Sequence, residues 1–411
     1  MPDIWDLIVI GGGASGMTAA IAAACLGEHV LVLEKSSALG RKIAASGNGR
    51  CNLMNVSNPI YYGQPAFADQ VFRHYSPDDL RYFWDDSGLC LTNDGTGRLY
   101  PRTYHSSTVL DTLKSLLKLY HTEIRLQTTV CSCQKAEGLF HTSSDKGSFL
   151  SKRVLIATGG PAAPNLGGTM SGHDILRSFG HKIMPLSPAL CPLCTDRLSI
   201  SGLNGIKARC HLRLFKHDQT QIFQTSGEIL FTDYGISGIC AMQCARFIDQ
   251  DDYTVLLDLS DGQFNDPHEL FNLTAKRRER YHDFPPEILL NGLVLPKLSY
   301  AVLKQAGIEL RSRKAGQLSN DELHAIAEHF LAYRICVHNT RGYEYAQVTR
   351  GGADCSEFNP ATMESNIMKG LYTSGEVMNI DGTCGGYNLI FAFITGILAG
   401  LNGRNKKELY K

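Results

Sequence analysis

The sequence predicts an α/β protein with a Rossmann-type domain that is built from both ends of the chain. Two observations indicate this fold: a strand, a glycine-rich turn, a helix and a second strand follow one another at the N-terminus, and a second glycine-rich region lies near the C-terminus. Between them, alternating polar and apolar residues are followed by a charged helical stretch. We therefore expect a Rossmann-like domain over 1–185 and 340–411, an inserted β-rich domain over 186–262 with 331–339, and a helical domain over 263–330.

The composition narrows the functional class. Forty Lys and Arg residues balance 40 Asp and Glu residues, so a small-molecule substrate is expected as the partner, and neither nucleic acid nor a membrane is. Thirteen cysteines, an odd number scattered over 411 residues, indicate reduced thiols. The N-terminus lacks the basic start of a signal peptide, and the apolar stretch at 389–401 is too short to span a bilayer. We expect a cytoplasmic protein, and the oligomeric state stays open.

The first three elements form a βαβ unit. The residues DLIVI at 6–10 predict a short buried strand, MTAAIAAACLG at 17–27 an Ala-rich helix, and HVLVLE at 29–34 a second strand. Further along, residues 107–119 have helical spacing, and residues 123–133 predict another strand. The order strand, helix, strand is that of a parallel crossover.

A G-x-G-x-x-G motif joins the first strand to the helix. Gly11 permits the tight turn, Gly13 lets a pyrophosphate approach the backbone, and Gly16 allows the helix to pack closely on the strand. The helix N-terminus then offers free amide groups to the pyrophosphate. Glu34, at the end of the second strand, accepts hydrogen bonds from ribose hydroxyls, which favours FAD or NAD over NADP.

The C-terminal region favours FAD over NAD. The segment LYTSG at 371–375 predicts a strand that ends in Gly375, and the acid after it, Glu376, suits the ribityl hydroxyls that NAD lacks. The segment RVLIATGG at 153–160 predicts a second strand followed by a glycine turn. A helix is expected from Tyr387, and its positive N-terminal end suits an anionic reduced flavin.

The stretch GRKIAASGNGRCN at 40–52 holds three kinds of candidate. Arg41 and Lys42 are expected to serve the ADP half of the cofactor as cations. Residues 46–52 are expected to form a glycine-permitted turn that brings backbone under the flavin. Cys51 is not expected to be a nucleophile, because no motif places a base beside it.

Several motifs together resemble the HI0933-like flavoprotein family. They are VIGGGASG at 9–16, EK at 34–35, GRK at 40–42, SGNGRCN at 46–52, ATGG at 157–160, GEILFTDYGISG at 227–238, AQVTRGGA at 346–353, TMES at 362–365, GEV at 375–377 and DGTCGGYN at 381–388. The motifs occur in the family's order over essentially the whole chain. The resemblance implies an FAD-binding domain formed by both chain ends, with an inserted β-barrel-like domain and a small helical domain.

The resemblance also implies which residues hold FAD. Positions along the ADP half are Gly11, Gly13, Ala14, Ser15, Gly16, Glu34, Lys35, Arg41 and Lys42, with Val130 at the adenine through its backbone. Positions at the ribityl chain and flavin ring are Ser46, Gly47, Asn48, Gly49, Gly159, Gly375, Glu376, Gly386, Tyr387 and Asn388. No metal site is expected, because the pair Cys191 and Cys194 has no second pair at metal spacing, and a redox role of that pair stays open.

Because the family includes a bile-acid reductase and an L-aminoacetone oxidase, the resemblance implies an FAD-dependent oxidoreductase. The leading expectation is reduction of an activated C=C bond, as in a steroid or bile-acid-like enone, with NAD(P)H as a transient hydride donor. Two alternatives stay open: an FAD-dependent amine oxidase that passes electrons from an aminoacetone-like substrate to O2, giving H2O2, and a flavin-binding protein without catalysis. The catalytic residues are not assigned, since Tyr104, His105 and Tyr234 are suitable proton donors by type only.

Overall fold

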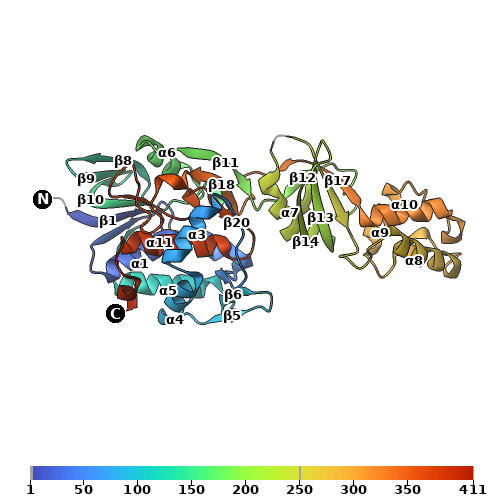
Figure 1. Cartoon of the computed structure of the whole chain (residues 1–411), viewed down its shortest axis with the longest axis horizontal. Helices are drawn as coiled ribbons and strands as arrows, with labels where there is room; N and C mark the ends of the chain where they lie inside the picture. Colours follow the sequence, from blue (N-terminus) through green and yellow to red (C-terminus); the bar gives the residue numbers. More distant parts are fainter. Residues whose placement is uncertain (1–2, 250, 411) are drawn as a thin grey trace. The chain divides into compact units, whose positions relative to one another are not determined.

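The computed structural model describes residues 3–249 and 251–410 of the chain, and the protein divides into two compact units. The first unit combines the chain up to residue 187 with the chain from residue 348 onward, and the second unit spans residues 188–347 (Figure 1). The predicted α/β fold with a Rossmann-type domain formed by both chain ends is confirmed. No helix within the described ranges is long and apolar enough to cross a membrane.

A seven-stranded sheet is the centre of the first unit. Its strands follow the order β7-β2-β1-β10-β9-β8, with β19 also paired to β10. The bounds are β7 Glu123–Arg125, β2 Val30–Leu33, β1 Ile4–Ile10, β10 Gly147–Ile156, β9 Leu139–Ser144, β8 Val130–Ala136 and β19 Leu371–Thr373. Strands β7, β2, β1, β10 and β19 are joined by parallel pairings, whereas β8, β9 and β10 form an antiparallel meander.

The register of this sheet brings three glycine turns to one edge. Ile10 lies opposite both Leu33 and Ile156, and Ile156 lies opposite Thr373. Because parallel strands end at the same edge, the segments that follow β1, β2, β10 and β19 begin side by side. Ligands of open parallel sheets bind at this carboxyl edge.

Helices α1 (Ala14–Cys25) and α11 (Tyr387–Leu401) join the two chain ends. They can pack closely because α11 carries glycine at two contact positions: a Cβ at Gly396 would lie 2.2 Å from the carbonyl oxygen of Ser15, and one at Gly400 would lie 2.3 Å from that of Ala19. Helix α11 begins at Tyr387 as predicted, and 13 of its 15 residues are buried. The C-terminal segment is therefore part of the core of the first unit.

Shorter elements complete the first unit. The helices are α2 Arg41–Ala45, α3 Pro65–His74, α4 Pro77–Asp86, α5 Ser106–Leu119 and α6 Ser171–Ser178, and the small-sheet strands are β3 Met54–Asn55, β4 Tyr61–Gly63, β5 Leu91–Asn93, β6 Arg98–Pro101, β11 Ile183–Ala189, β18 Val348–Ala353 and β20 Ile380–Gly382.

The prediction of a single strand over 123–133 is wrong, because this segment contains two separate strands, β7 and β8. Between them Gln127 adopts a left-handed backbone (φ 52°) and its amide donates to Ser36 O, so the chain turns back toward the end of β2.

The second unit contains a closed barrel with strand order β12-β15-β14-β13-β16-β17, which confirms the barrel implied by the resemblance. The bounds are β12 Leu193–Thr195, β13 Lys207–Lys216, β14 Gln221–Phe231, β15 Gly235–Ser237, β16 Tyr253–Asp258 and β17 Tyr333–Thr340, and the short helix α7 spans Ile239–Cys244. Strand β13 alternates buried and accessible residues: Cys210, Leu212 and Leu214 are buried, while Arg209 and His211 are accessible. The barrel interior is thus filled by alternate side chains of each strand.

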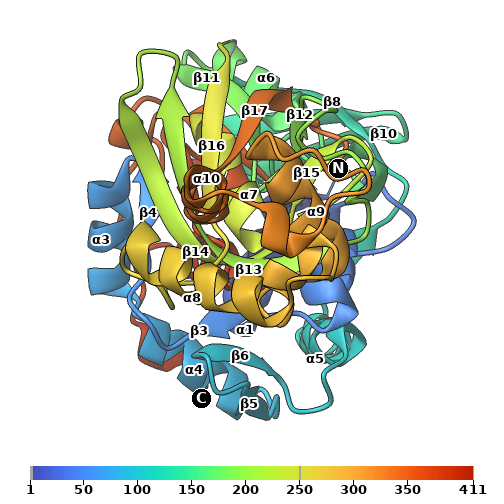
Figure 2. The ribbon, with the colours of Figure 1, turned by 90° about the vertical axis from the view of Figure 1, so that its right-hand side faces the viewer.

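Three helices lie between the barrel strands β16 and β17 in the chain: α8 (Pro267–Arg280), α9 (Pro296–Gln305) and α10 (Asn320–Leu331), which are labelled in Figure 2. Asp266 caps α8 by accepting from His268 N, and Ser319 forms a capping box with Glu322 at the start of α10. Barrel and helices cluster as one compact unit, and their separation into two domains stays a prediction.

Candidate functional site

The turn after β1 has the backbone that a dinucleotide motif requires. Gly11 has φ +107°, and a Cβ there would lie 2.5 Å from Ala157 O, while a Cβ at Gly16 would lie 1.9 Å from Gly11 O. A Cβ at Gly13, in contrast, would meet no protein atom within 4 Å. Gly11 and Gly16 are therefore needed for packing, whereas Gly13 faces open space at the start of α1.

The N-terminus of α1 offers unpaired amides beside that space. The first helical bond runs from Met17 N–H to Gly13 O, so the amides of Ala14, Ser15 and Gly16 have no acceptor within the helix. The N-cap, Gly13, has no side chain to satisfy them. Such a terminus is suited to bind a phosphate.

Glu34 is held rigidly at the end of β2. Its carboxylate accepts from Gly12 N and Ser36 N, each at 2.7 Å, and its carbonyl accepts from Thr128 N at 2.9 Å. The last contact places the start of β8, with buried Val130, beside the Glu34 loop. Glu34 and Val130 therefore lie in the same region. This agrees with the prediction that Glu34 binds the ribose and Val130 the adenine of one FAD molecule.

The three cationic residues predicted along the ADP half of FAD, Lys35, Arg41 and Lys42, differ in their contacts. Lys35 Nζ lies 3.5 Å from Gly168 O, and the exposed Arg41 donates to Asn165 O at 2.8 Å. Lys42 instead pairs with Glu376, with 2.8 Å between Nζ and Oε2. Because Lys42 precedes Glu376 by 334 positions, this ion pair ties the N-terminal part of the site to the C-terminal part.

The glycine turn after β10 packs against Glu376. A Cβ at Gly160 would lie 2.3 Å from Thr349 Oγ1, and one at Gly159 would lie 3.7 Å from Glu376 Oε2. Thr349 also donates its amide to Glu376 Oε1 at 3.0 Å. On the other side of Glu376, a Cβ at Gly375 would lie 2.7 Å from Ser15 Oγ. Thr349, which belongs to the motif AQVTRGGA but was given no role from the sequence, helps to orient this carboxylate.

The loop at 46–49 has an unusual backbone. Gly47, Asn48 and Gly49 have φ values of 56°, 55° and 81°, so three successive residues are left-handed. Ser46 begins the loop and donates its hydroxyl to Ile43 O at 2.8 Å. Asn48 is not a glycine, and such backbone strain occurs preferentially at functional sites.

The same loop region meets the start of α11. A Cβ at Gly386, whose φ is +98°, would lie 3.0 Å from Asn52 Oδ1, and Asn55 Nδ2 donates to Gly385 O at 2.9 Å. Tyr387 is buried, and its carbonyl accepts from a tyrosine hydroxyl. The amide of Asn388 is engaged on both sides by the backbone of Gly382, so it holds the turn before α11.

Unsatisfied polar atoms lie in this part of the unit. Among the described residues, Asn52 Oδ1 and Ser374 Oγ are buried without a hydrogen-bond partner. Asn52 neighbours Gly386, and Ser374 precedes Gly375. Buried polar groups normally have partners. Together with the open space at Gly13, these atoms fit a ligand with phosphate and hydroxyl groups, as FAD has. The role of each residue in holding it stays a prediction.

His173 is a further member of the site that sequence reasoning missed. It lies on α6, which packs on the turn after β10: a Cβ at Gly172 would lie 2.0 Å from Thr158 Oγ1. Burial lowers the pKa of His173 to about 4, although nearby Glu376 opposes the shift. The imidazole is therefore neutral at pH 7. In sequence SGHDIL is an ordinary short helix, and no signal there marks the histidine.

Two of the proton-donor candidates lie in the first unit. Tyr104 has a left-handed backbone (φ 54°), is 40% exposed and packs at a tilt against Tyr100, with 5.5 Å between ring centroids. Tyr100 Cε1 in turn lies 3.7 Å from the position of a Cβ on Gly47. Tyr104 is thus connected to the 46–49 loop through one aromatic contact. His105 is the exposed N-cap of α5, and Tyr234 belongs to the second unit.

The cysteines that sequence reasoning weighed are poor nucleophiles. Cys51 is fully buried, and burial raises its pKa to about 11. Burial likewise raises the pKa of Cys191 to about 11. Within residues 3–249 and 251–410, no group of three or more His, Cys, Asp or Glu side chains is arranged to hold a metal ion.

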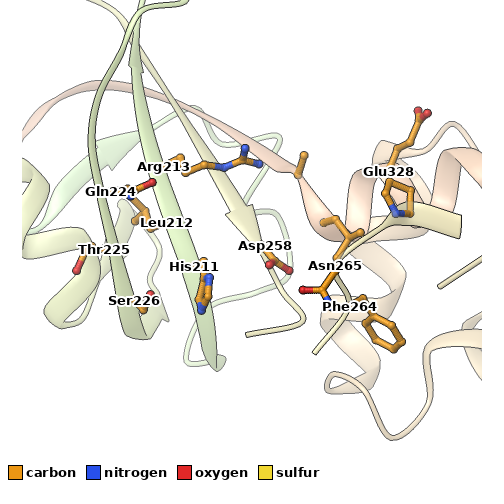
Figure 3. Close-up of a pocket in the computed structure, with 13 residues that line it drawn as sticks. His211, Leu212, Arg213, Gln224, Thr225, Ser226, Asp258, Phe264, Asn265 and Glu328 are labelled. Carbon is orange, nitrogen blue, oxygen red and sulfur yellow. The ribbon is translucent and has the colours of Figure 1, made fainter. Parts of the chain in front are cut away.

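A separate cavity of about 830 Å³ lies within the second unit, between the barrel and its helices (Figure 3). Strands β13 and β14 contribute neighbouring polar side chains, among them Arg213 and Gln224, and the helical side contributes Glu328. None of the residues predicted to bind the cofactor lines this cavity. Its lining carries both signs of charge and indicates no ligand class.

Comparisons with known proteins agree with the motifs. The model of the family described as HI0933-like protein Rossmann domain matches residues 5–402, which confirms the resemblance. A 3-dehydro-bile acid delta(4,6)-reductase from Clostridium scindens is 32% identical over 95% of this chain and 97% of its own length. Ribosomal RNA dihydrouridine synthases from Escherichia coli and Haemophilus influenzae are 28% and 27% identical over 95% and 96% of this chain and 95% and 97% of their own lengths.

Proposed function

Because the chain belongs to the HI0933-like Rossmann-domain family and is an FAD-dependent oxidoreductase, we propose that it reduces a C=C bond conjugated to a carbonyl group. The substrate class that we propose is a steroid or bile-acid-like enone, with NAD(P)H as the transient hydride donor. The observation that carries this proposal is the 32% identity, over nearly both full lengths, to a reductase named for such a substrate.

A second candidate substrate is uridine in RNA, and the two relatives named for ribosomal RNA support it. Uracil and a 3-oxo-4,6-diene steroid share one reacting group, a C=C bond conjugated to a carbonyl. The same chemistry therefore serves either substrate. The balanced charge of the chain, 40 cationic and 40 anionic residues, favours the small molecule, because nucleic-acid binding depends on excess positive charge. Exclusion of nucleic acid and a cytoplasmic location stay predictions.

The residues of the first unit would hold FAD in the order predicted from the sequence. The free amides at the start of α1 would bind the pyrophosphate, and Glu34 would bind the adenosine ribose. Glu376 would lie toward the ribityl chain, and Lys42, which the sequence assigns to the ADP half, would reach Glu376 through their ion pair. When bound and reduced by NAD(P)H, the flavin would supply the hydride that adds to the β-carbon of the enone.

The reaction also needs a proton at the α-carbon, from an acid of the chain or from water. We assign this step to the Tyr104 hydroxyl, because Tyr104 is exposed, strained and connected through Tyr100 to the 46–49 loop. The proton leaves the Tyr104 oxygen for the α-carbon as the carbonyl group is restored. Solvent then reprotonates the phenolate.

Anaerobic mixing tests the proposed function. NADH or NADPH should bleach the flavin absorbance of the purified protein, and a 3-oxo-4-ene steroid acid should then restore it. Recovery with uridine-containing RNA but not with the steroid would select the second substrate. Bleaching by aminoacetone, with H2O2 on admission of air, would instead identify an amine oxidase. A flavin that none of these reagents bleaches would identify a protein without catalysis.

A further inference from the structure

The short antiparallel strands β3 and β6 of the first unit form a ribbon with two distinct faces. Asn55 lies opposite Arg98, and Met54 lies opposite Leu99. Residues directly opposite one another share a face, so Asn55 and Arg98 lie on one face of the ribbon. Met54 and Leu99, which are buried, lie on the other. Because side chains alternate along a strand, Tyr100 lies on the same face as Arg98.

Two contacts show which part of the molecule the face with Arg98 meets. Asn55 Nδ2 donates to Gly385 O at 2.9 Å, in the turn before α11. Tyr100 Cε1 lies 3.7 Å from the position of a Cβ on Gly47, in the left-handed loop. Arg98 therefore belongs to a face that contacts both segments predicted to hold the flavin ring.

The charge of Arg98 acts on side chains of the turn before α11. Burial raises the pKa of the Cys384 thiol, and the positive charge of Arg98 opposes this shift. Burial also raises the pKa of the Tyr387 hydroxyl, and a hydrogen bond with Ser57 and the charge of Arg98 oppose that shift. These effects agree with the strand pairing, since both place the Arg98 side chain beside this turn.

The Arg98 guanidinium is half-buried and has no protein partner. Within residues 3–249 and 251–410 it forms no hydrogen bond or ion pair. The exposed Asp94, in the turn before β6, directs its Oδ1 to Thr96 instead, accepting from the amide at 2.8 Å and from the hydroxyl at 2.7 Å. Charged groups that are partly withdrawn from water normally have a partner. An unpartnered guanidinium at this place therefore suits an oxygen of a ligand that carries negative charge.

We propose that Arg98 binds the carbonyl oxygen of the enone and stabilises the negative charge that this oxygen gains during reduction, and the assignment rests on the proposed function. Addition of a hydride to the β-carbon moves the C=C electron pair toward the α-carbon and the carbonyl pair onto oxygen, which gives an enolate. The guanidinium offers that oxygen both N–H donors and positive charge. A proton at the α-carbon then restores the C=O bond, and oxidation of the flavin balances reduction of the substrate.

The position of Arg98 agrees with the assigned proton donor. Tyr104 packs against Tyr100 with 5.5 Å between ring centroids, and Tyr100 is two residues beyond Arg98 on β6. The carbonyl oxygen and the α-carbon of an enone are both bonded to the carbonyl carbon. The two groups that serve them must therefore approach the ligand from neighbouring positions, as Arg98 and Tyr104 do.

Binding of 4-nitrophenol to the oxidised holoprotein tests the assignment without turnover. Its phenolate resembles an enolate, because its charge lies on an oxygen conjugated to C=C bonds. Titration calorimetry above and below the pKa of the probe compares the phenolate with the neutral phenol. R98Q should weaken binding of the phenolate about 10- to 150-fold, as expected for loss of hydrogen bonds to a charged group, and leave binding of the phenol within about twofold.

Stopped-flow absorbance gives a second measurement on the same variant. R98Q should slow reoxidation of the reduced flavin by the enone about 10²- to 10³-fold, the usual effect of removing one donor to a developing oxyanion, and leave bleaching by NAD(P)H unchanged. R98K keeps the charge and should recover part of both losses, and it provides the same comparison if R98Q does not fold.

Control variants and cofactor binding separate this role from a structural one. R102Q removes the same charge from the exposed Arg102, four residues after Arg98, and it should change neither the affinities nor the rates. Thermal unfolding of R98Q and its Kd for FAD should match those of the parent.

Equal phenolate affinity of R98Q and the parent would overturn the proposal, and so would equal losses for the phenolate and the phenol. A raised Kd for FAD or slower bleaching by NAD(P)H would also overturn it, because Arg98 would then act on the flavin. Failure of the proposed function is a separate result: no enone would reoxidise the flavin of the parent, whereas binding of the phenolate needs no turnover.

Discussion

Two glycines of the first turn provide the sharpest test of how the cofactor is held. Gly13 has φ −80° and ψ −166°, which alanine adopts freely, and its added Cβ meets no protein atom within 4 Å. Gly13→Ala should therefore leave the unfolding free energy of the apoprotein unchanged or raise it by about 0.4–1 kcal/mol. The methyl group would occupy the space assigned to the pyrophosphate. Loss of close hydrogen bonds to a charged group costs about 1.5–3 kcal/mol, which raises the Kd for FAD about 10- to 150-fold.

Gly16→Ala is the matched comparison, because its Cβ would lie 1.9 Å from Gly11 O. That overlap forces α1 away from the turn, and overpacking of this kind costs about 1–3 kcal/mol of folding free energy. Thermal unfolding of the apoproteins and fluorescence titration with FAD separate the two effects. Gly13→Ala should lose affinity without losing stability, whereas Gly16→Ala should lose stability. A Gly13→Ala protein that binds FAD as the parent does would refute the assignment of the pyrophosphate to this turn.

Three further predictions follow from the site. Burial lowers the pKa of His173 from 6.5 to about 4, so the folded protein binds fewer protons than the unfolded chain between these pH values, and its stability falls as the pH falls through this window. Between pH 7 and pH 4, the unfolding free energy of His173→Gln should therefore fall by up to about 3 kcal/mol less than that of the parent, as measured by urea unfolding at both pH values. An equal fall in variant and parent would contradict the lowered pKa of His173. Cys51→Ser should keep its flavin and most of its turnover, because burial raises the Cys51 pKa to about 11; loss of turnover with flavin retained would show that the thiol takes part in the reaction. Tyr104→Phe should slow flavin reoxidation by the enone about 10²- to 10⁴-fold and leave bleaching by NAD(P)H unchanged, as stopped-flow absorbance would show, and equal rates with the parent would exclude this proton donor.

The fold could be predicted because its signals are local. The run DLIVI, the G-x-G-x-x-G turn and the Ala-rich helix each have a short-range physical cause, and the structure places them in β1, the turn after it and α1. The start of α11 at Tyr387 was equally local, since Gly385 and Gly386 precede it. The prediction of a single strand over 123–133 was wrong, because the chain turns at Gln127. That turn depends on a hydrogen bond from Gln127 N to Ser36 O, and Ser36 is distant in sequence.

The candidate site was predicted in part for the same reason. Glycines and the acids at strand ends are recognisable in sequence, but their partners are not. The Lys42–Glu376 pair joins residues 334 positions apart, and the Thr349 amide and buried His173 reach Glu376 only through the fold. Contacts of this kind carry no periodicity that a single sequence displays.

Product analysis under anaerobic conditions tests the central claim, reduction of a conjugated C=C bond through FAD, most directly. The protein would be incubated in D2O with NAD(P)H and a 3-oxo-4-ene steroid acid, and the steroid would be analysed by mass spectrometry. The account predicts a saturated ketone formed in a one-to-one ratio with the nicotinamide oxidised, with a carbon-bound deuterium at the α-position. Recovery of unchanged steroid from flavin that NAD(P)H has fully reduced would contradict it.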